Sequence, residues 1–190
     1  MRFDRSMTEA LYVYAFEAPS LTDSFRLVSI LGSLEALALV GALVAVVLLV
    51  QRCWLTLAAW LVAVLGGEAL NLLLKDLFAR PRPHFEHPLV VETSYSFPSG
   101  QAMESLVVYG MLAYFAVLTL KGWGKHAFSV GGAAVLVALI GFSRVYLGAH
   151  YVSDVVGGFA AGGAWLGALI TAREAIRRRD PARRDQVSSF

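Results

Sequence analysis

The residues of this sequence that could do chemistry lie in three short clusters, each at the end of a long apolar segment. The clusters are Lys75–Pro83 (KDLFARPRP), Tyr95–Gln101 (YSFPSGQ) and Ser143–Asp154 (SRVYLGAHYVSD). Together they supply several cations, a Ser-Gly pair typical of a helix start, and a His followed by an Asp. Cations and free backbone amides bind phosphate, and a positioned His can act as a nucleophile. The three clusters therefore predict a phosphate site.

The third cluster contains the candidate nucleophile. His150 and Asp154 are four residues apart, so on a helix they share one face. The carboxylate can then hold one imidazole nitrogen and leave the other facing a substrate, which fixes the tautomer and stabilises a charged imidazole. An interfacial His beside a satisfied Asp is the alternative for this pair alone. Arg144, at the predicted end of the preceding helix, disfavours that alternative because a buried cation is costly without a partner.

The first cluster supplies cations on a stiffened chain. Pro81 and Pro83 end the preceding helix and hold the following segment extended. A Lys acts on phosphate as a point charge, whereas an Arg can bind two oxygens at once. We expect phosphate contacts from Lys75 and Arg82. We interpret Arg80 as a cation that snorkels from the helix end toward the membrane interface.

The second cluster has the composition of a helix start. Pro98 suits the first turn, Ser99 can cap the helix, and Gly100 lets an oxyanion approach the backbone. Free amide groups and the helix dipole favour a phosphate at such a position. Alone, a Pro-Ser-Gly run indicates only a common helix cap.

The elements that must position these clusters are membrane helices. Of the 190 residues, 57% are hydrophobic and only 16% are charged, which indicates an integral membrane protein. The length allows a single membrane domain over residues 1–190. We predict an all-α polytopic bundle with about five spanning helices, because each apolar segment is close to the ~20 residues that a bilayer requires. The predicted spans are residues 27–50, 54–78, 99–120, 127–147 and 150–172, preceded by an interfacial amphipathic helix at residues 7–18.

The charge distribution predicts the orientation of the bundle. Residues 173–190 are rich in arginine and are predicted to form a cytoplasmic tail, because positive charge gathers on that side. Counting back through five spans places Lys121 and Lys125 inside and the loop at residues 79–97 outside. The three clusters then share the extracytoplasmic face of the cell membrane. We interpret the tail as a solvated anchor near anionic lipid heads, not as a nucleic-acid-binding segment.

With these residues in place, the chain resembles the type 2 phosphatidic acid phosphatase superfamily. Its pattern is Lys, six residues, Arg-Pro; then Pro-Ser-Gly-His; then Ser-Arg, five residues, His, three residues, Asp. Lys75 and Arg82-Pro83 match the first motif, and Ser143-Arg144, His150 and Asp154 match the third. Membrane members include bacterial phosphatidylglycerophosphate phosphatases and undecaprenyl diphosphate phosphatases.

The resemblance implies a set of roles. His150 would attack phosphorus and form a phosphohistidine, and Asp154 would orient His150. The phosphate of a lipid phosphate or polyprenyl diphosphate would be held by a cradle of five residues, Lys75, Arg82, Ser99, Gly100 and Arg144. The family implies no metal and no other cofactor.

One residue departs from the family pattern. The middle motif ends in His, the acid that protonates the leaving oxygen, and this chain has Gln101. Gln can donate a hydrogen bond but cannot give up a proton, and loss of a general acid typically costs about 100- to 10,000-fold. Three explanations are open: an engineered substitution, a native preference for a diphosphate with a less basic leaving group, or lipid-phosphate binding without hydrolysis.

Other polar residues near the clusters are candidates for supporting roles. Glu104 lies three residues beyond Gln101, and His84, Glu86 and His87 follow the first cluster; each could replace the missing acid. Glu68 and Asn71 share a helix face with Lys75, and we expect them to support it. A transporter is a further alternative, since Glu35, Glu68 and Glu104 lie within predicted spans. The cations, however, gather at one end and do not follow a path.

Overall fold

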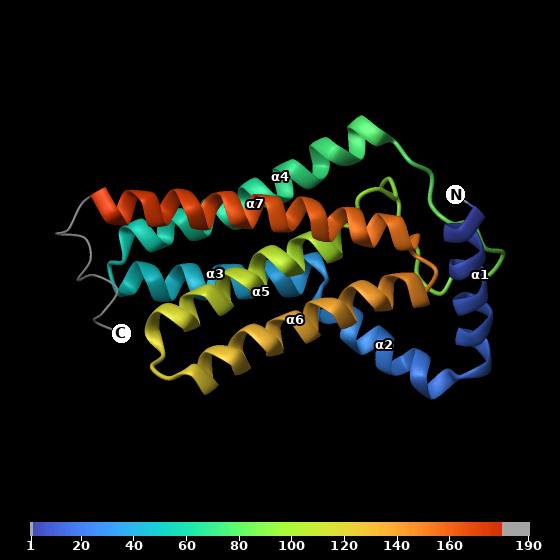
Figure 1. The fold of residues 1–190 in the computed structure, drawn as a ribbon. Coiled ribbons are helices and arrows are strands. Elements are labelled where there is room, and N and C mark those ends of the chain that lie inside the picture. The colour runs from blue at the N-terminus through green and yellow to red at the C-terminus, as the bar shows by residue number, and fades with distance from the viewer. Residues whose placement is uncertain (1, 180–190) are drawn as a thin grey trace.

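Helices account for all the regular structure in a computed structural model that describes residues 2–179 (Figure 1). Within this range there is no β-strand. The elements are α1 (Arg2–Glu17), α2 (Pro19–Leu31), α3 (Leu34–Val50), α4 (Trp54–Phe78), α5 (Gly100–Thr119), α6 (Trp123–Tyr146) and α7 (Val152–Arg179).

Four helices, α4 to α7, are each long and apolar enough to cross a membrane, and the bent pair of α2 and α3 is together long and apolar enough for a fifth span. The predicted all-α membrane bundle with about five spans is confirmed. A single first helix at residues 27–50 is wrong, because the span starts at Pro19 and bends by 40° between α2 and α3. Ser33 Oγ accepts a hydrogen bond from Ala36 N at 3.2 Å and so starts a new helix at the bend.

Helix α1 crosses the end of the bundle instead of running along it (Figure 1). It is longer than the interfacial helix predicted at residues 7–18. Several large apolar side chains on it are exposed, as expected for a helix lying at a membrane surface: Met7, Val13, Tyr14 and Phe16. The ring of Tyr12 stacks on Phe85 at 3.7 Å, and its hydroxyl donates to the carbonyl oxygen of His87 at 2.6 Å. Helix α1 therefore holds the loop between α4 and α5.

Helix α7 extends beyond the predicted span end at residue 172. The tail predicted at residues 173–190 therefore begins as helix, and Arg173 is not solvated, since it is only 3% exposed. Its guanidinium donates to Tyr114 Oη at 2.8 Å and to Thr56 Oγ1 at 3.2 Å. Arg173 thus joins α7 to α4 and α5. Residues 180–190 of the predicted tail, with Arg183 and Arg184, lie outside the described range.

Helix α5 is central and packs against α4, α6 and α7. Glycines on α7 allow the closest of these contacts. A Cβ atom at Gly158 would lie 2.7 Å from Ser99 O, and one at Gly162 would lie 2.8 Å from Met103 O. These small residues thus bring the α7 backbone against α5. One result is a hydrogen bond from Ser99 N to Asp154 O at 3.0 Å, which joins the start of α5 to the start of α7.

The ends that carry the three clusters meet at one end of the bundle. The end of α4, the start of α5, the end of α6 and the start of α7 all lie at the end where α1 crosses (Figure 1). Segments separated by some 70 residues in sequence are thereby brought together.

We expect Gly158→Ala to destabilise the protein, because the atoms that its Cβ would meet include backbone atoms of α5 that cannot move independently. The expected cost is about 1–3 kcal/mol, measured as a lower thermal unfolding temperature in detergent. Gly167→Ala is the matched control on the same helix, since nothing lies within 4 Å of its Cβ position. Equal unfolding temperatures for the two variants would contradict the close α5–α7 contact.

Candidate active site

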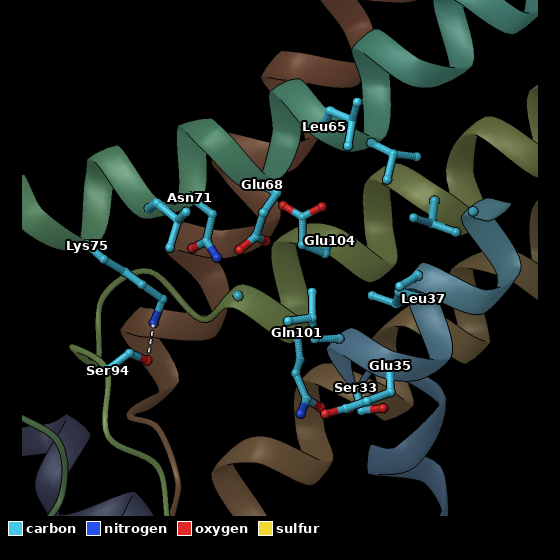
Figure 2. A pocket seen from close by; sticks show the side chains of 18 of the residues that line it. Ser33, Glu35, Leu37, Leu65, Glu68, Asn71, Lys75, Ser94, Gln101 and Glu104 are labelled. Atoms are coloured by element: carbon cyan, nitrogen blue, oxygen red, sulfur yellow. Dashed lines mark hydrogen bonds between the residues drawn. The ribbon is translucent and has the colours of Figure 1, made fainter. Parts of the chain in front are cut away.

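A cavity of about 680 Å³ opens beside the three clusters. Its polar end is lined by Lys75, Arg82, Glu92, Gln101 and His150. Its other end runs between α3 and α4 and is apolar, with Leu37 and Leu65 among the side chains there (Figure 2). The cavity therefore suits a molecule with an anionic head and an apolar tail.

His150 lies in the tight turn between α6 and α7. The turn requires Gly148, whose φ of +70° is in the left-handed region. Arg82 Nη1 is 3.0 Å from His150 Nε2. A guanidinium can only donate, so Nε2 carries a lone pair and the proton is on Nδ1. That nitrogen faces Asp154 Oδ2 at 3.6 Å.

The surroundings keep His150 neutral. Burial lowers the pKa of His150 to about 4, and the positive charges of Arg82 and Arg144 act in the same direction. The hydrogen bond and charge of Asp154 oppose this lowering without reversing it. At neutral pH the imidazole is therefore uncharged, which is the form that can attack an electrophile.

Asp154 is completely buried and fixed by several donors. Its Oδ2 accepts hydrogen bonds from Ser96 Oγ and from Tyr151 N, the latter at 2.9 Å, and its Oδ1 accepts one from Arg80 Nη1 at 2.7 Å. Ser96 was missed by the sequence interpretation, although it lies inside the second cluster. Its hydroxyl is also 3.5 Å from His150 Nδ1, so it bridges the two residues.

The interpretation of Arg80 as a snorkelling cation is wrong. The chain turns at Ala79, whose φ is +42°, and Arg80 enters the protein instead of the interface. It bonds Asp154 and, through Nη2 at 3.1 Å, Asp4 on α1. Two carboxylates explain how this cation can be held with its side chain only 19% exposed. Asp4 had no signal in the sequence, because it lies outside all three clusters.

Of the three cations expected to bind phosphate, Lys75 and Arg82 line the polar end of the cavity, and Arg144 lies beside it, joined to Arg82 through Glu92. Lys75 Nζ donates to Tyr95 O at 2.6 Å and to Ser94 Oγ at 3.3 Å. Arg82 donates through Nε to Ser94 O at 2.7 Å. Arg144 is 1% exposed and donates through Nη1 to Ser29 Oγ at 2.7 Å. The loop at residues 79–98 therefore supplies many of the acceptors for these cations.

Glu92 bridges the two arginines. Its Oε2 pairs with Arg82 Nη2 at 3.2 Å, and its Oε1 pairs with Arg144 Nη2. Two carboxylate oxygens on two guanidinium groups reproduce the contacts that phosphate oxygens would make. Glu92 was also missed, although an acidic residue next to the apolar pair Val90 and Val91 was a visible signal.

The start of α5 contributes differently at each position. Gly100 lines the cavity, and a Cβ there would come 2.7 Å from Asn71 Nδ2. Ser99 is fully buried and does not line the cavity; its backbone amide is used by Asp154 O. Gln101 Oε1 accepts from Ser29 Oγ at 3.2 Å, and Ser29 in turn accepts from Arg144. Gln101 is thus connected to Arg144 through Ser29.

Glu68 and Asn71, which were expected to support Lys75, lie one to two turns before it on α4 and line the cavity together with Glu104 of α5 (Figure 2). None of the three makes a hydrogen bond to Lys75. Asn71 Oδ1 and Glu104 Oε1 have no hydrogen-bond partner among the described residues. His84 and His87 do not line this cavity. Among the residues suggested as substitutes for an acid at position 101, Glu104 therefore lines the cavity and the others do not.

Comparison with known proteins gives the following matches. A sequence model described as the PAP2 superfamily matches residues 54–178. Phosphatidylglycerophosphatase B of Bacillus subtilis is 50% identical over 94 residues, which are 49% of this chain and 46% of that protein. Decaprenylphosphoryl-5-phosphoribose phosphatase of Mycobacterium tuberculosis is 34% identical over 128 residues, which are 63% of this chain and 64% of that protein. Each alignment thus spans less than two thirds of the curated relative.

A solved structure is similar over nearly the whole chain. The crystal structure of a transmembrane PAP2 type phosphatidylglycerolphosphate phosphatase from Bacillus subtilis has a TM-score of 0.83 and 34% sequence identity. The match covers 93% of this chain and 87% of that one. The arrangement of helices described above is therefore that of a PAP2 membrane protein.

We expect Glu92→Gln to strengthen the binding of inorganic phosphate by at least about tenfold, because the variant removes a carboxylate that competes for the same two arginines. The dissociation constant can be measured by titration calorimetry of the detergent-solubilised protein. Glu86→Gln, an equal charge change at an exposed position of the same loop, should leave it unchanged. Weaker binding in Glu92→Gln would mean instead that Glu92 is needed to hold the arginines in place.

Proposed function

The chain belongs to the PAP2 superfamily, and from this premise we propose that it is a membrane lipid phosphatase that acts through a phosphohistidine intermediate. The relatives are named for phosphatidylglycerophosphate and for decaprenylphosphoryl-5-phosphoribose, and both names describe a phosphate carried on a lipid. The observation that carries the proposal is the position of His150 Nε2. It lies 3.0 Å from Arg82, at the polar end of a cavity that continues between apolar helices.

The first step would transfer the phosphoryl group to His150. The substrate phosphate displaces Glu92 from Arg82 and Arg144, and Arg82 releases Nε2 to bind a phosphate oxygen. The Nε2 lone pair forms a bond to phosphorus, and the bond from phosphorus to the leaving oxygen breaks. Asp154 stabilises the positive imidazole through Nδ1–H, while the three cations balance the charge on the phosphoryl oxygens.

The second step would release inorganic phosphate. Water attacks the phosphohistidine, the N–P bond breaks, and its electron pair returns to Nε2. The attacking water releases one proton to solvent, and the inorganic phosphate so formed leaves the cradle. His150 returns to the neutral state that its buried position favours. Glu92 can then return to the two arginines.

Two features of the site bear on which lipid is used. Gln101 cannot protonate a leaving alkoxide, which favours a diphosphate whose leaving group is a much weaker base. The carboxyl groups of Glu68 and Glu104, however, line the cavity on the apolar side of the cradle, where they offer a second phosphate no further cation. A monoester substrate would not need one. The second candidate function is binding of a lipid phosphate without hydrolysis. It is favoured by the presence of Gln101 at the position of the usual acid.

The site would lie on the extracytoplasmic side. The site is at the end of the bundle where α1 lies, whereas Lys121, Lys125 and the basic residues late in α7 lie at the other end (Figure 1). Positive charge at that other end supports a cytoplasmic C-terminus. The lipid tail would then occupy the apolar part of the cavity with its head at the outer surface.

The decisive test is phosphate release in detergent from a polyprenyl diphosphate and from a phosphatidate, for this chain and for Gln101→His. We expect Gln101→His to raise kcat on the phosphatidate by about 100-fold or more, because it restores a general acid. We expect a smaller gain on the diphosphate. His150→Ala should abolish release from both lipids.

The outcomes separate the candidates. No release by either form, with lipid phosphate still bound, would replace hydrolysis by the binding function. Release that persists in His150→Ala would exclude a phosphohistidine on this residue. Equal gains on both lipids would mean that Gln101 does not discriminate between leaving groups.

A further inference from the structure

Asp4, near the start of helix α1, makes hydrogen bonds to Arg80 and Ser153. Both residues lie beside His150 and Asp154, the dyad of the proposed reaction. Asp4 Oδ1 accepts from Ser153 N at 3.1 Å, and its Oδ2 accepts from Ser153 Oγ at 2.5 Å and from Arg80 Nη2 at 3.1 Å. The Asp4 side chain is only 13% exposed. Three donor atoms of two residues far along the chain thus hold a carboxylate that lies outside residues 54–178, the part that matches the family.

Arg80 connects Asp4 to the dyad. Its Nη1 donates to Asp154 Oδ1 at 2.7 Å and to Ser153 Oγ at 2.6 Å, while its Nη2 faces Asp4. The guanidinium also lies over the Tyr151 ring at 4.4 Å. Negative and positive groups therefore alternate from Asp4 through Arg80 to Asp154, and His150 follows at the end of this series.

The position of Arg80 has two opposite effects on Asp154. It fixes one carboxylate oxygen, so that the other, Oδ2, remains on the His150 side. Its positive charge also weakens the ability of Asp154 to stabilise a positive imidazole, which is the form that develops when Nε2 attacks phosphorus. The carboxylate of Asp4 partly neutralises Arg80. It therefore lessens the weakening of Asp154 while Arg80 still fixes the Asp154 oxygen.

Asp4 also acts on the helix that carries Asp154. Ser153 is in the first turn of α7, and its backbone N–H is one of those that a helix leaves without an internal partner. The Asp4 carboxylate satisfies that donor from another helix and lies at the positive end of the α7 dipole. Both contacts restrain the turn from which Asp154 projects.

We propose that Asp4 is a positioning residue of the active site, acting through Arg80 and Ser153 on Asp154 and thereby on His150. The proposal rests on the proposed function for its kinetic consequences. It assigns to α1 a part in catalysis in addition to its place at the membrane surface. The neighbouring pair of Arg5 and Glu9 on the same helix, 3.7 Å apart and largely exposed, has no such connection.

The test compares Asp4→Asn, Arg80→Gln and the double variant, with Glu9→Gln as the matched control on α1. Asp4→Asn should lower kcat about tenfold, roughly the effect of one charge-assisted hydrogen bond, with KM within twofold of the unchanged protein. Asp4→Asn should have a clearly smaller effect when Arg80 is already Gln, because of its two connections to Asp154 only the one through Ser153 is then left. Glu9→Gln should change neither constant, and thermal unfolding should separate loss of fold from loss of rate.

A second measurement does not depend on turnover. The ¹⁵N resonances of the His150 side chain, assigned by comparison with His150→Asn, should move in Asp4→Asn and stay in place in Glu9→Gln. Unmoved resonances, or equal kinetic effects of Asp4→Asn with and without Arg80, would overturn the positioning role. If no form hydrolyses any lipid but the resonances still move in Asp4→Asn, the proposed function fails and the positioning of His150 by Asp4 stands.

Discussion

The cost of burying three cations at one end of an apolar bundle is the constraint on which the rest of the structure depends. Lys75 and Arg144 are almost fully buried, and Arg82 is nearly so, in a place where an unpartnered charge would be expensive. The loop between α4 and α5 offsets this burial penalty, because its carbonyl and hydroxyl oxygens accept hydrogen bonds from Lys75 and Arg82. Glu92 completes the arrangement, and it stabilises the free protein by the same contacts that a phosphate would replace.

The same constraint explains why the bundle is closed so tightly at this end. Asp154 and Ser99 can share a backbone hydrogen bond only because glycines on α7 let it approach α5. That contact brings the start of α7 beside the second cluster, where Ser96 reaches both Asp154 and His150. Helix α1 then covers the loop through Tyr12 and Phe85 and holds Arg80 through Asp4. The close packing of α7 on α5 and of α1 on the loop therefore places the charged and polar partners of Asp154 within bonding distance.

The parts of this arrangement that depend on local sequence signals were predictable, whereas those that depend on contacts between distant residues were not. Apolar length predicted the spans, because it is a local signal. Residue types at fixed spacing are also local, and they singled out His150, Asp154 and the three cations, which the structure brings to one end of the bundle. Bends and partners are not local. The break at Ser33 depends on a cap inside an apolar run, and the burial of Arg80 depends on Asp4, 76 residues away. Arg173 was misread for the same reason, since its partners Tyr114 and Thr56 lie on other helices.

Gln101 shows how far such a site can change at one position while its electrostatics are kept. A histidine there would bring a transferable proton, whereas the amide of Gln101 brings only hydrogen bonds, one of them with Ser29. The contacts of Arg144, Arg82 and Lys75 do not involve Gln101 directly, so binding and charge stabilisation do not require an acid at this position. In the proposed reaction, stabilisation of the transferred phosphoryl group and protonation of the leaving group would therefore be separable functions of the site. A protein that keeps the first and lacks the usual group for the second should be sensitive above all to the basicity of its leaving group.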